Sequence, residues 1–338
     1  MSEEFQPGTS GQAWKRRALW LLKLGFTILL LALAFQHVPL RALGDAWSRI
    51  RMGWAIGAVI IYVPLCVLAE SARLWAAGRR VAAPPLTIRE WASAFLASRP
   101  WFYLLPASAG ADGMVWYHLR RKGWSHGGCG YTLLSVRFWG LALWALIAGM
   151  SLIMAPETGG ILSGIPPWLM SPRLWLAGGC ITLLGCALAP HWLARKEHVD
   201  LKSAGPADPF LHLSLTVFSA LIAAASVWMA ARATALPFGL LTCLGLLAWL
   251  TFAMALPISL GGLGLQEALV LRLGLPLGLP AATLLAFSGI VHLMRAILAL
   301  TGGLAAIKGD PIPPGTQAAS KKPVEQPPQR GVHPDSRA

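Results

Sequence analysis

Residues Leu256–Glu267 read L-P-I-S-L-G-G-L-G-L-Q-E and interrupt an apolar segment that otherwise runs from Pro237 to Leu275. Pro257 has no amide hydrogen, and the three glycines of the stretch have no side chain to hold a helix. Within a membrane, opened backbone is tolerated only where protein or a water-filled cavity satisfies the freed N–H and C=O groups. The stretch therefore predicts a re-entrant hairpin that points at an internal site.

The same signature occurs in the first half of the chain. Residues Leu105–Gly113 read L-P-A-S-A-G-A-D-G, so both copies fit L-P-x-S-x-G-x-x-G, with an offset of 151 residues between Pro106 and Pro257. Matched helix breaks in the two halves of a membrane chain are a sequence pattern that points to a transport-type binding site. We therefore expect the two motifs to meet around one cavity.

The composition is that of a polytopic membrane protein. Of the 338 residues, 56% are hydrophobic and 12% are charged, which is too few charges to cover a soluble globule of this size. The formal net charge of +14 comes from short basic clusters between apolar runs, which is typical of orientation signals and anionic-lipid contacts rather than of nucleic-acid binding. The five cysteines show no paired or metal-ligand spacing, so we expect neither a disulfide nor a metal.

Six apolar runs are long enough to cross the hydrocarbon core, which takes about 20 residues. They cover approximately residues 18–38, 52–77, 130–155, 174–193, 210–231 and 281–307. The two remaining apolar segments, Trp91–Tyr117 and Pro237–Leu275, carry the broken motifs. The predicted fold is therefore an all-α polytopic membrane protein with about six full transmembrane helices and two broken re-entrant hairpins.

The charges of the loops predict the orientation of the chain. Basic clusters occur at residues 15–17, 79–89, 120–122, 195–202 and 308–322. By the positive-inside rule these segments are cytoplasmic, so the first hairpin enters and leaves on one side and both termini lie in the cytoplasm. The presumed outer loop Pro39–Arg51 is an exception, with three arginines against one aspartate. We expect the protein in the cell (inner) membrane.

The two halves align as span, span, hairpin, span, with repeat 1 at about residues 18–155 and repeat 2 at about residues 174–307. Each first-half element runs opposite to its partner, which predicts an inverted-topology repeat. Both repeats belong to one transmembrane domain, residues 14–308. A polar tail, residues 1–13, precedes it, and a Pro-rich cytoplasmic tail, residues 309–338, has the composition of a disordered segment.

Four blocks of the chain resemble a known family. They are L-P-I-S-L-G-G-L-G-L-Q-E, L-L-P-A-S-A-G-A-D followed by L-R-R-K-G, the Arg137 of L-L-S-V-R-F-W-G, and L-M-R-A-I-L-A-L-T-G-G from Leu293. Together they resemble the flippase-like family of the lysylphosphatidylglycerol synthase transmembrane region. The resemblance implies a module associated with translocating aminoacylated or glycosylated lipids, sometimes fused to a soluble aminoacyltransferase domain. A Pro-rich tail follows the last apolar run here, and no catalytic motif is present, so we do not expect an enzyme.

Charged residues at apparent membrane depth cost roughly 2.5–3.5 kcal/mol each unless they are paired or hydrated, so they predict a polar interior. They are Glu70, Arg73, Arg99, Asp112, Arg137, Glu267, Arg272 and Arg295. We interpret Glu70 and Arg73, three residues apart on one helix, as a fixed ion pair rather than as a substrate contact. Glu267 follows the glycines and is either a capping acid or a cation- or proton-handling group. His292, on an apolar helix, is interpreted as structural.

Arg137 and Arg295 occupy corresponding positions in the third spans of the two halves. Each contacts an anionic head group, pairs with Asp112 or Glu267 across the repeat interface, or snorkels to the nearer surface; we favour the interior for both. The predicted substrate-binding set, without catalytic residue, metal or cofactor, is Pro106, Ser108, Gly110, Asp112, Arg137, Pro257, Ser259, Gly261, Gly262, Gly264, Glu267 and Arg295.

These patterns favour a lipid-translocation module that handles a lipid head group at a midplane cavity between the two hairpins. Its expected partner is a membrane lipid with an anionic or modified head group. Two alternatives stay open: a membrane-embedded transferase acting on a lipid carrier, and a non-transporting partner subunit of a separately encoded lipid-modifying enzyme.

Overall fold

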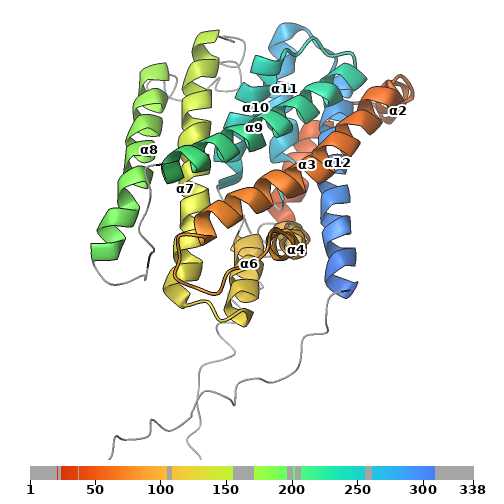
Figure 1. The fold of residues 1–338 in the computed structure, drawn as a ribbon. Helices are drawn as coiled ribbons and strands as arrows, with labels where there is room; N and C mark the ends of the chain where they lie inside the picture. Colours follow the sequence, from red (N-terminus) through yellow and green to blue (C-terminus); the bar gives the residue numbers. More distant parts are fainter. Residues whose placement is uncertain are drawn as a thin grey trace, which may run out of the picture.

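The protein is a bundle of helices (Figure 1). The computed structural model describes residues 21, 24–36, 38–104, 109–154, 171–195, 201, 207–255 and 261–308. Within these ranges there is no β-strand, only an isolated bridge between Val81 and Leu201. The all-α prediction is therefore confirmed, while the two predicted tails lie outside the described residues.

The helices follow one another along the chain. After a first helix at Leu24–Phe35 they are α2 (Leu40–Ser48), α3 (Met52–Gly78), α4 (Ile88–Ser98), α5 (Trp101–Leu104), α6 (Ala109–Arg121), α7 (His126–Met154), α8 (Pro172–Arg195), α9 (Ala207–Ala233), α10 (Leu240–Ala255), α11 (Leu265–Gly274), the 3-10 helix η3 (Leu275–Leu277) and α12 (Ala281–Lys308).

Four of these helices are long and apolar enough to cross a membrane: α3, α7, most of α9 and most of α12. They correspond to four of the six predicted spans. The predicted span at residues 18–38 corresponds to the helix Leu24–Phe35, after which the chain bends by 80° into α2, and this pair counts as a fifth span if taken together. The predicted span at residues 174–193 lies within α8, where Pro172–Leu188 is apolar and the side chains beyond Leu188 lie outside the described residues. The chain is thus a membrane protein with four or five candidate spans.

One helix ends before each broken motif; the next begins within the first motif, so that its Gly110 and Gly113 are helical, and directly after the glycines of the second. In the first motif α5 ends at Leu104 and α6 begins at Ala109; in the second α10 ends at Ala255 and α11 begins at Leu265. The second motif turns through three glycines with φ angles of 57°, 81° and 80°, at Gly261, Gly262 and Gly264. This left-handed region is accessible to glycine without steric cost.

The turn of the second motif also packs closely against the first helix. A Cβ atom built on Gly264 would lie 2.5 Å from the Cβ atom of Leu30. Gly264 therefore permits both the backbone conformation and the approach of a neighbouring helix.

The helices α3 and α9 lie side by side in opposite directions and are joined at both ends (Figure 1). At one end the Arg51 amide donates to the Ala233 carbonyl oxygen at 2.9 Å. At the other end the Arg79 guanidinium contacts the Asp208 carboxylate, and Arg80 Nε lies 3.5 Å from the same carboxylate. The helices α3 and α9 are therefore held together at both ends.

The packing around α7 is mirrored by the packing around α12. The helix α7 packs against α8 and α10, and α12 packs against α2 and α4. Likewise α3 contacts α4 as α9 contacts α10, and α6 contacts α7 as α11 contacts α12. These four pairings in one half of the chain therefore have counterparts in the other half.

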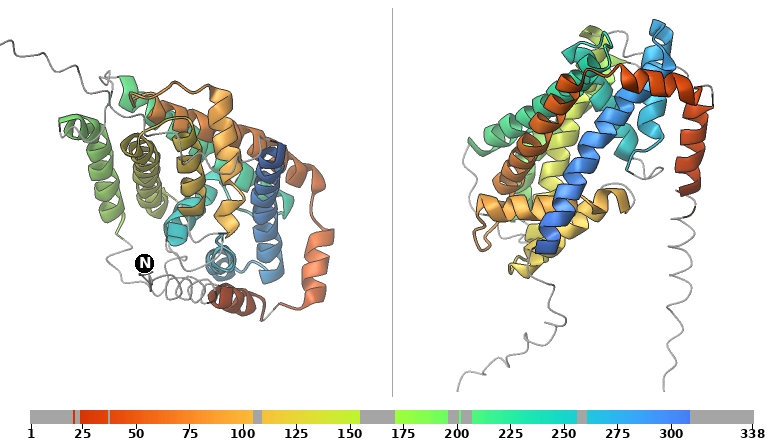
Figure 2. Two further views of the ribbon diagram at one scale, coloured as in Figure 1. Left: turned by 90° about the horizontal axis from the view of Figure 1, so that it is seen from below. Right: turned by 90° about the vertical axis from the view of Figure 1, so that its right-hand side faces the viewer.

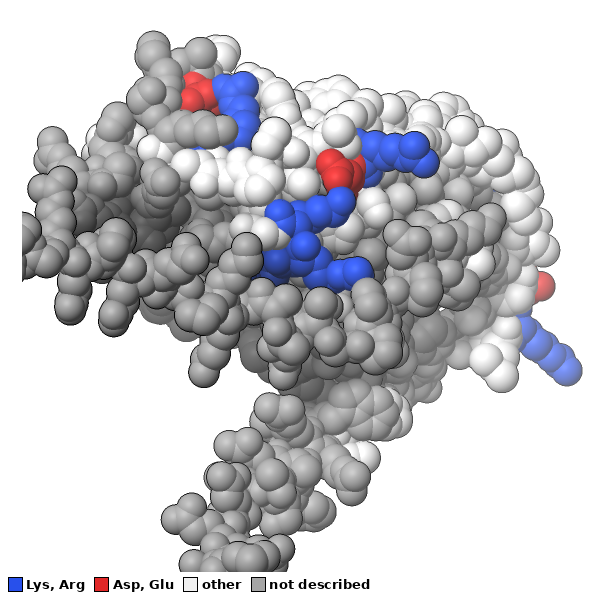
Figure 3. Space-filling view, turned by 60° about the horizontal axis from the view of Figure 1, so that its bottom comes forward, with Lys and Arg blue, Asp and Glu red and all other residues white. Residues whose placement is uncertain are grey.

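The end of α12 and the connection between α6 and α7 lie at the same end of the molecule (Figures 1 and 2). Basic side chains mark this connection at Arg120, Arg121 and Lys122. A space-filling view with this end turned toward the viewer shows the charged side chains of the described residues in small groups (Figure 3).

Candidate functional site

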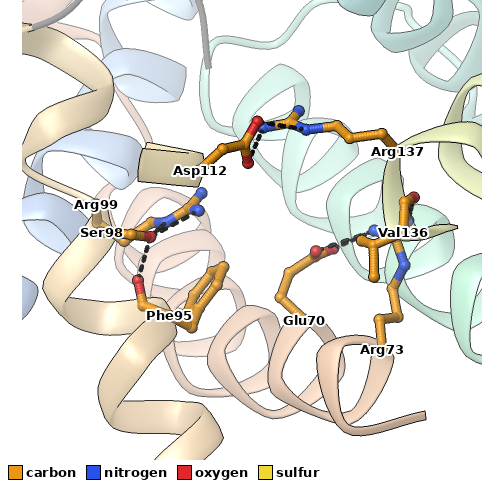
Figure 4. A network of polar contacts seen from close by, with 8 residues as sticks. All are labelled: Glu70, Arg73, Phe95, Ser98, Arg99, Asp112, Val136 and Arg137. Carbon is orange, nitrogen blue, oxygen red and sulfur yellow. Dashed lines mark hydrogen bonds and ion pairs between the residues drawn. The ribbon is translucent and has the colours of Figure 1, made fainter. Parts of the chain in front are cut away.

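A cavity of about 400 Å³ lies among α3, α4, α6, α7 and the end of α10. Its charged lining consists of three arginines and two acids: Glu70, Arg73, Arg99, Asp112 and Arg137. Figure 4 shows these side chains arranged around a common space. Apolar residues from the same helices, Phe95, Val115 and Trp144 among them, complete the wall. The bundle thus holds a polar interior between apolar helices.

One side of the cavity is fixed by the ion pair of Glu70 and Arg73. Arg73 Nη1 lies 2.8 and 2.9 Å from the two Glu70 carboxylate oxygens. Arg73 Nη2 also donates to the Val136 carbonyl oxygen at 3.0 Å, and the Ser219 hydroxyl donates to Glu70. The predicted ion pair is therefore present, and it joins α3 to α7 and α9 while lining the cavity.

A second ion pair joins the first broken motif to α7. Arg137 contacts Asp112 through two parallel hydrogen bonds, 3.1 Å from Nε to Oδ2 and 2.7 Å from Nη2 to Oδ1. Asp112 lies in the first turn of α6, where the helix dipole favours a carboxylate. The side chains are 43% and 32% exposed for Arg137 and Asp112, against 11% and 22% for Arg73 and Glu70. The Asp112–Arg137 pair is thus the more accessible of the two.

Arg99 brings a third guanidinium to the cavity. It donates to Ser98 Oγ from Nη2 at 3.1 Å and from Nε at 3.3 Å, and its guanidinium carbon lies 4.1 Å from the Phe95 ring centroid. Neither partner carries a negative charge, and no carboxylate lies within 4 Å of Arg99 in the part of the chain that the structure describes. With the other two arginines paired, Arg99 leaves one positive charge in the lining.

The helix α4 carries Phe95 and Ser98 and is followed directly by Arg99. Polar contacts, here called the clamp, hold the start of this helix. The Thr87 hydroxyl accepts from the Glu90 amide at 3.3 Å, and Glu90 accepts from the Thr87 amide at 2.8 Å, which is a capping box. Lys122 Nζ donates to Glu90 Oε1 at 2.6 Å. The hydrogen bonds from Lys122 and Thr87 lower the pKa of Glu90 to about 2. This clamp fixes the helix that positions Arg99.

A separate polar cluster lies at the second broken motif. Glu267 Oε2 accepts from the Gly264 amide at 2.7 Å, so Glu267 caps α11, as one of its two interpretations predicted. Its other oxygen, Oε1, lies 2.9 Å from His292 Nε2 and accepts from the Ser288 hydroxyl at 3.1 Å. The Glu267 residue is 5% exposed. Capping therefore uses only one of its carboxylate oxygens.

Arg295 does not pair with Glu267 as one interpretation proposed. Its Nη1 donates to Gln266 Oε1 at 2.8 Å and lies 4.0 Å from the Met254 sulfur. Gln266 Nε2 donates in turn to Ser288 Oγ at 2.8 Å. Gln266 and Glu267 are adjacent on α11, so their side chains point about 100° apart around the helix axis. Arg295 therefore pairs with Gln266 and not with the expected Glu267.

The predicted site residues thus fall into two groups rather than one. Asp112 and Arg137 line the cavity, whereas Glu267 and Arg295 belong to the cluster at the second motif. Among the described residues of the second hairpin, Thr251 and Met254 line the cavity, and residues 256–260 of the second motif lie outside the described part of the chain. Gly110, Gly261, Gly262 and Gly264 are buried beside their turns, and Pro106, Ser108, Pro257 and Ser259 lie outside the described residues.

Sequence reasoning placed Arg99 at membrane depth but left it out of the predicted site. The only sequence signal was its charge within an apolar hairpin, one residue before a proline. Its place in the cavity depends on how α4 packs between α3, α6 and α12, which no local pattern gives.

Comparison with known families matches residues 20–303 to the family described as the lysylphosphatidylglycerol synthase TM region. The match includes both broken motifs, every residue that lines the cavity and the cluster around Glu267. No curated protein matches the chain.

Proposed function

Because the chain belongs to the family of the lysylphosphatidylglycerol synthase transmembrane region, we propose that it is a lipid-translocation module that binds a lipid head group in the cavity beside the first motif. The observation that carries this proposal is the charged lining of a cavity of about 400 Å³ among helices apolar enough to cross a membrane. Charge at such depth is costly unless it faces an interior with a function.

The chemistry of the lining favours an anionic group on the lipid. Arg99 supplies a guanidinium without a carboxylate partner among the described residues, and guanidinium groups bind phosphate and carboxylate oxygens in planar, bidentate geometry. Arg137 lies beside it in an exposed ion pair that a stronger anion can compete with. The cavity therefore fits a phosphate-containing head group, while the acyl chains remain in the bilayer.

An inverted repeat, as the aligned motifs predict, would give the module two related conformations. In its support, α3 and α9 run in opposite directions, and the pairings of α7 recur in α12. In this arrangement α3 and α9 flank the pseudo-twofold axis, and the hairpins α4–α6 and α10–α11 are equivalent. Rocking of one repeat against the other would expose the cavity to each leaflet in turn.

The orientation follows from the basic end of the molecule. The connection between α6 and α7 carries Arg120, Arg121 and Lys122, and α12 ends at Lys308 on the same side. We place this end in the cytoplasm of a cell whose inner membrane holds the protein, with both termini on that side.

The test is lipid movement by the purified full-length chain in sealed vesicles that contain fluorescent phospholipids. Arg99→Gln is expected to slow the movement of a phospholipid at least about tenfold, because a hydrogen bond to a charged group contributes about 1.5–3 kcal/mol. Arg89→Gln is the matched control, since Arg89 is exposed on the same helix and does not line the cavity. Equal rates in wild type and Arg99→Gln would contradict the proposal.

The same preparation separates the two alternatives. A lipid-carrier transferase would turn over its substrate in detergent, where no leaflets exist. A partner subunit would move no lipid alone and would co-purify with a lipid-modifying enzyme. A translocation module shows movement in vesicles and no turnover in detergent.

A further inference from the structure

The cluster at the second motif contains more buried polar groups than helix capping needs. Gln266, Glu267 and Ser288 are 2%, 5% and 0% exposed, and the side chain of His292 is 14% exposed. None of them lines the cavity. An ionised carboxylate at such burial is costly unless it is hydrogen-bonded, and a nearby positive charge compensates that cost further.

His292 is the residue that can supply this compensation. Its Nε2 lies 2.9 Å from Glu267 Oε1, the carboxylate oxygen that capping does not use. Both ring nitrogens of His292 are buried, and neither makes a hydrogen bond of good geometry to the described residues. Whichever nitrogen carries the hydrogen of the neutral imidazole, the other keeps a lone pair that no donor uses. That nitrogen is therefore free to accept a second proton.

The charged surroundings of the pair are sparse. On α12 itself Arg295 reaches the cluster through Gln266, and on α3 Tyr62 interacts with Arg295. The neighbouring end of α10 contributes the apolar Met254, and the helix Leu24–Phe35 has no titratable residue. On α11 the remaining charged residue, Arg272, is exposed. Glu267 is thus the acid that interacts with His292.

We propose that Glu267 and His292 form a proton-binding site, separate from the head-group cavity. Uptake of one proton from water at the free imidazole nitrogen converts a carboxylate and a neutral imidazole into a carboxylate–imidazolium pair, and release reverses the step. The net charge of the cluster changes by one, and no bond other than N–H forms or breaks. Glu267 Oε2 keeps its bond to the Gly264 amide in both states.

The same geometry disfavours a metal ion at this place. The described residues contain no group of three or more His, Cys, Asp and Glu that could hold one. In addition, the side-chain amide oxygen of Gln266 could serve as a metal ligand, but it already accepts a hydrogen bond from the Arg295 guanidinium at 2.8 Å. A fixed positive charge so close repels a metal cation, whereas an imidazole nitrogen binds a proton covalently.

The proton site adjoins the cavity through two side chains. Arg295 contacts Gln266 on one side and the sulfur of Met254 on the other, and Met254 lines the cavity. The cluster that contains His292 is therefore linked to the cavity wall through Arg295 and Met254. The site is inferred from its own geometry and does not depend on lipid translocation.

The test follows the imidazole of His292 by NMR in the full-length protein, labelled with ¹⁵N-histidine and held in lipid nanodiscs. The signal that disappears in His292→Gln is assigned to His292, and it is titrated between about pH 4 and about pH 9. In Glu267→Gln, which keeps an oxygen for the cap, the midpoint is expected to move by about one pH unit or more, because coupled groups titrate as a pair. Asp45→Asn, which removes an exposed carboxylate on α2, is expected to leave it unchanged.

A second variant keeps the test decisive if Glu267→Gln does not fold. Ser288→Ala removes the hydroxyl that donates to Oε1 and leaves the cap intact, so it is expected to displace the same midpoint by a smaller amount. The proposal is overturned if His292 does not titrate in the wild type. It is also overturned if the midpoint stays unchanged in every folded variant of Glu267 and Ser288.

Discussion

The guanidinium of Arg73 on α3 donates to the backbone carbonyl of Val136 on α7 at 3.0 Å, directly before Arg137 in the chain. The ion pair of Arg73 with Glu70 thus holds the stretch of α7 from which Arg137 reaches Asp112. A Cβ atom on Gly140, one turn further along α7, would lie 3.0 Å from the same guanidinium. The fixed pair and the accessible pair are parts of one wall of the cavity.

Glu70→Gln is expected to lower the free energy of unfolding by about 3 kcal/mol, because it leaves the buried Arg73 without its counter-charge. The double variant Glu70→Gln/Arg73→Met should recover part of the loss, since it removes the uncompensated charge as well. Thermal unfolding of the purified protein in detergent measures both. A double variant less stable than Glu70→Gln would show that Arg73 stabilises mainly through Val136.

The clamp between Glu90 and Lys122 predicts a dependence of stability on pH. The pKa of Glu90 is about 2 in the folded protein, below its ordinary value of 4.5, so the fold favours the ionised carboxylate. The contribution of the clamp is therefore complete above about pH 4.5 and is lost as the pH falls toward about 2. The difference in unfolding temperature between wild type and Glu90→Gln should shrink over this range. It should be small throughout, because the pair is at the surface.

Local backbone chemistry made the helix breaks predictable. Proline and glycine act on their own residue and its immediate neighbours, so the ends of α5 and α10 and the starts of α6 and α11 followed from the sequence. The ion pair of Glu70 and Arg73 was equally local, three residues apart on one helix face. Such features depend on residues that are close together in the sequence, so their geometry can be predicted from it.

Features that depend on packing between distant segments were not predictable in the same way. The hydrogen bond from Ser219 to Glu70 joins residues in different halves of the chain, and Arg99 reaches the cavity only because α4 packs against α3 and α6. A periodic pattern fixes the face of a helix but not the partner it meets.

Gly264→Ala is expected to destabilise the protein, whereas Gly44→Ala serves as a neutral control. A side chain at Gly264 requires a left-handed conformation, which costs about 1–2 kcal/mol, and its Cβ would collide with that of Leu30. Gly44 lies within α2 with no atom within 4 Å of an added Cβ. Unfolding temperatures compare the two variants. A stable Gly264→Ala would mean that the first helix can move away from the turn.

Asp112→Asn is expected to strengthen the binding of an anionic phospholipid, while Arg137→Gln should weaken it. In the wild type Asp112 occupies Arg137 through two hydrogen bonds, so a phosphate must displace a carboxylate before it can use that guanidinium. Asparagine keeps the shape but removes the competing charge, which leaves both Arg99 and Arg137 available to the ligand. Native mass spectrometry with phosphatidylglycerol should register a gain of about threefold to tenfold for Asp112→Asn, equal to about 0.7–1.4 kcal/mol. Arg89→Gln again controls for loss of surface charge. If Asp112→Asn binds the lipid more weakly than the wild type, Asp112 itself contacts the head group, and the ligand of the cavity carries a positive charge.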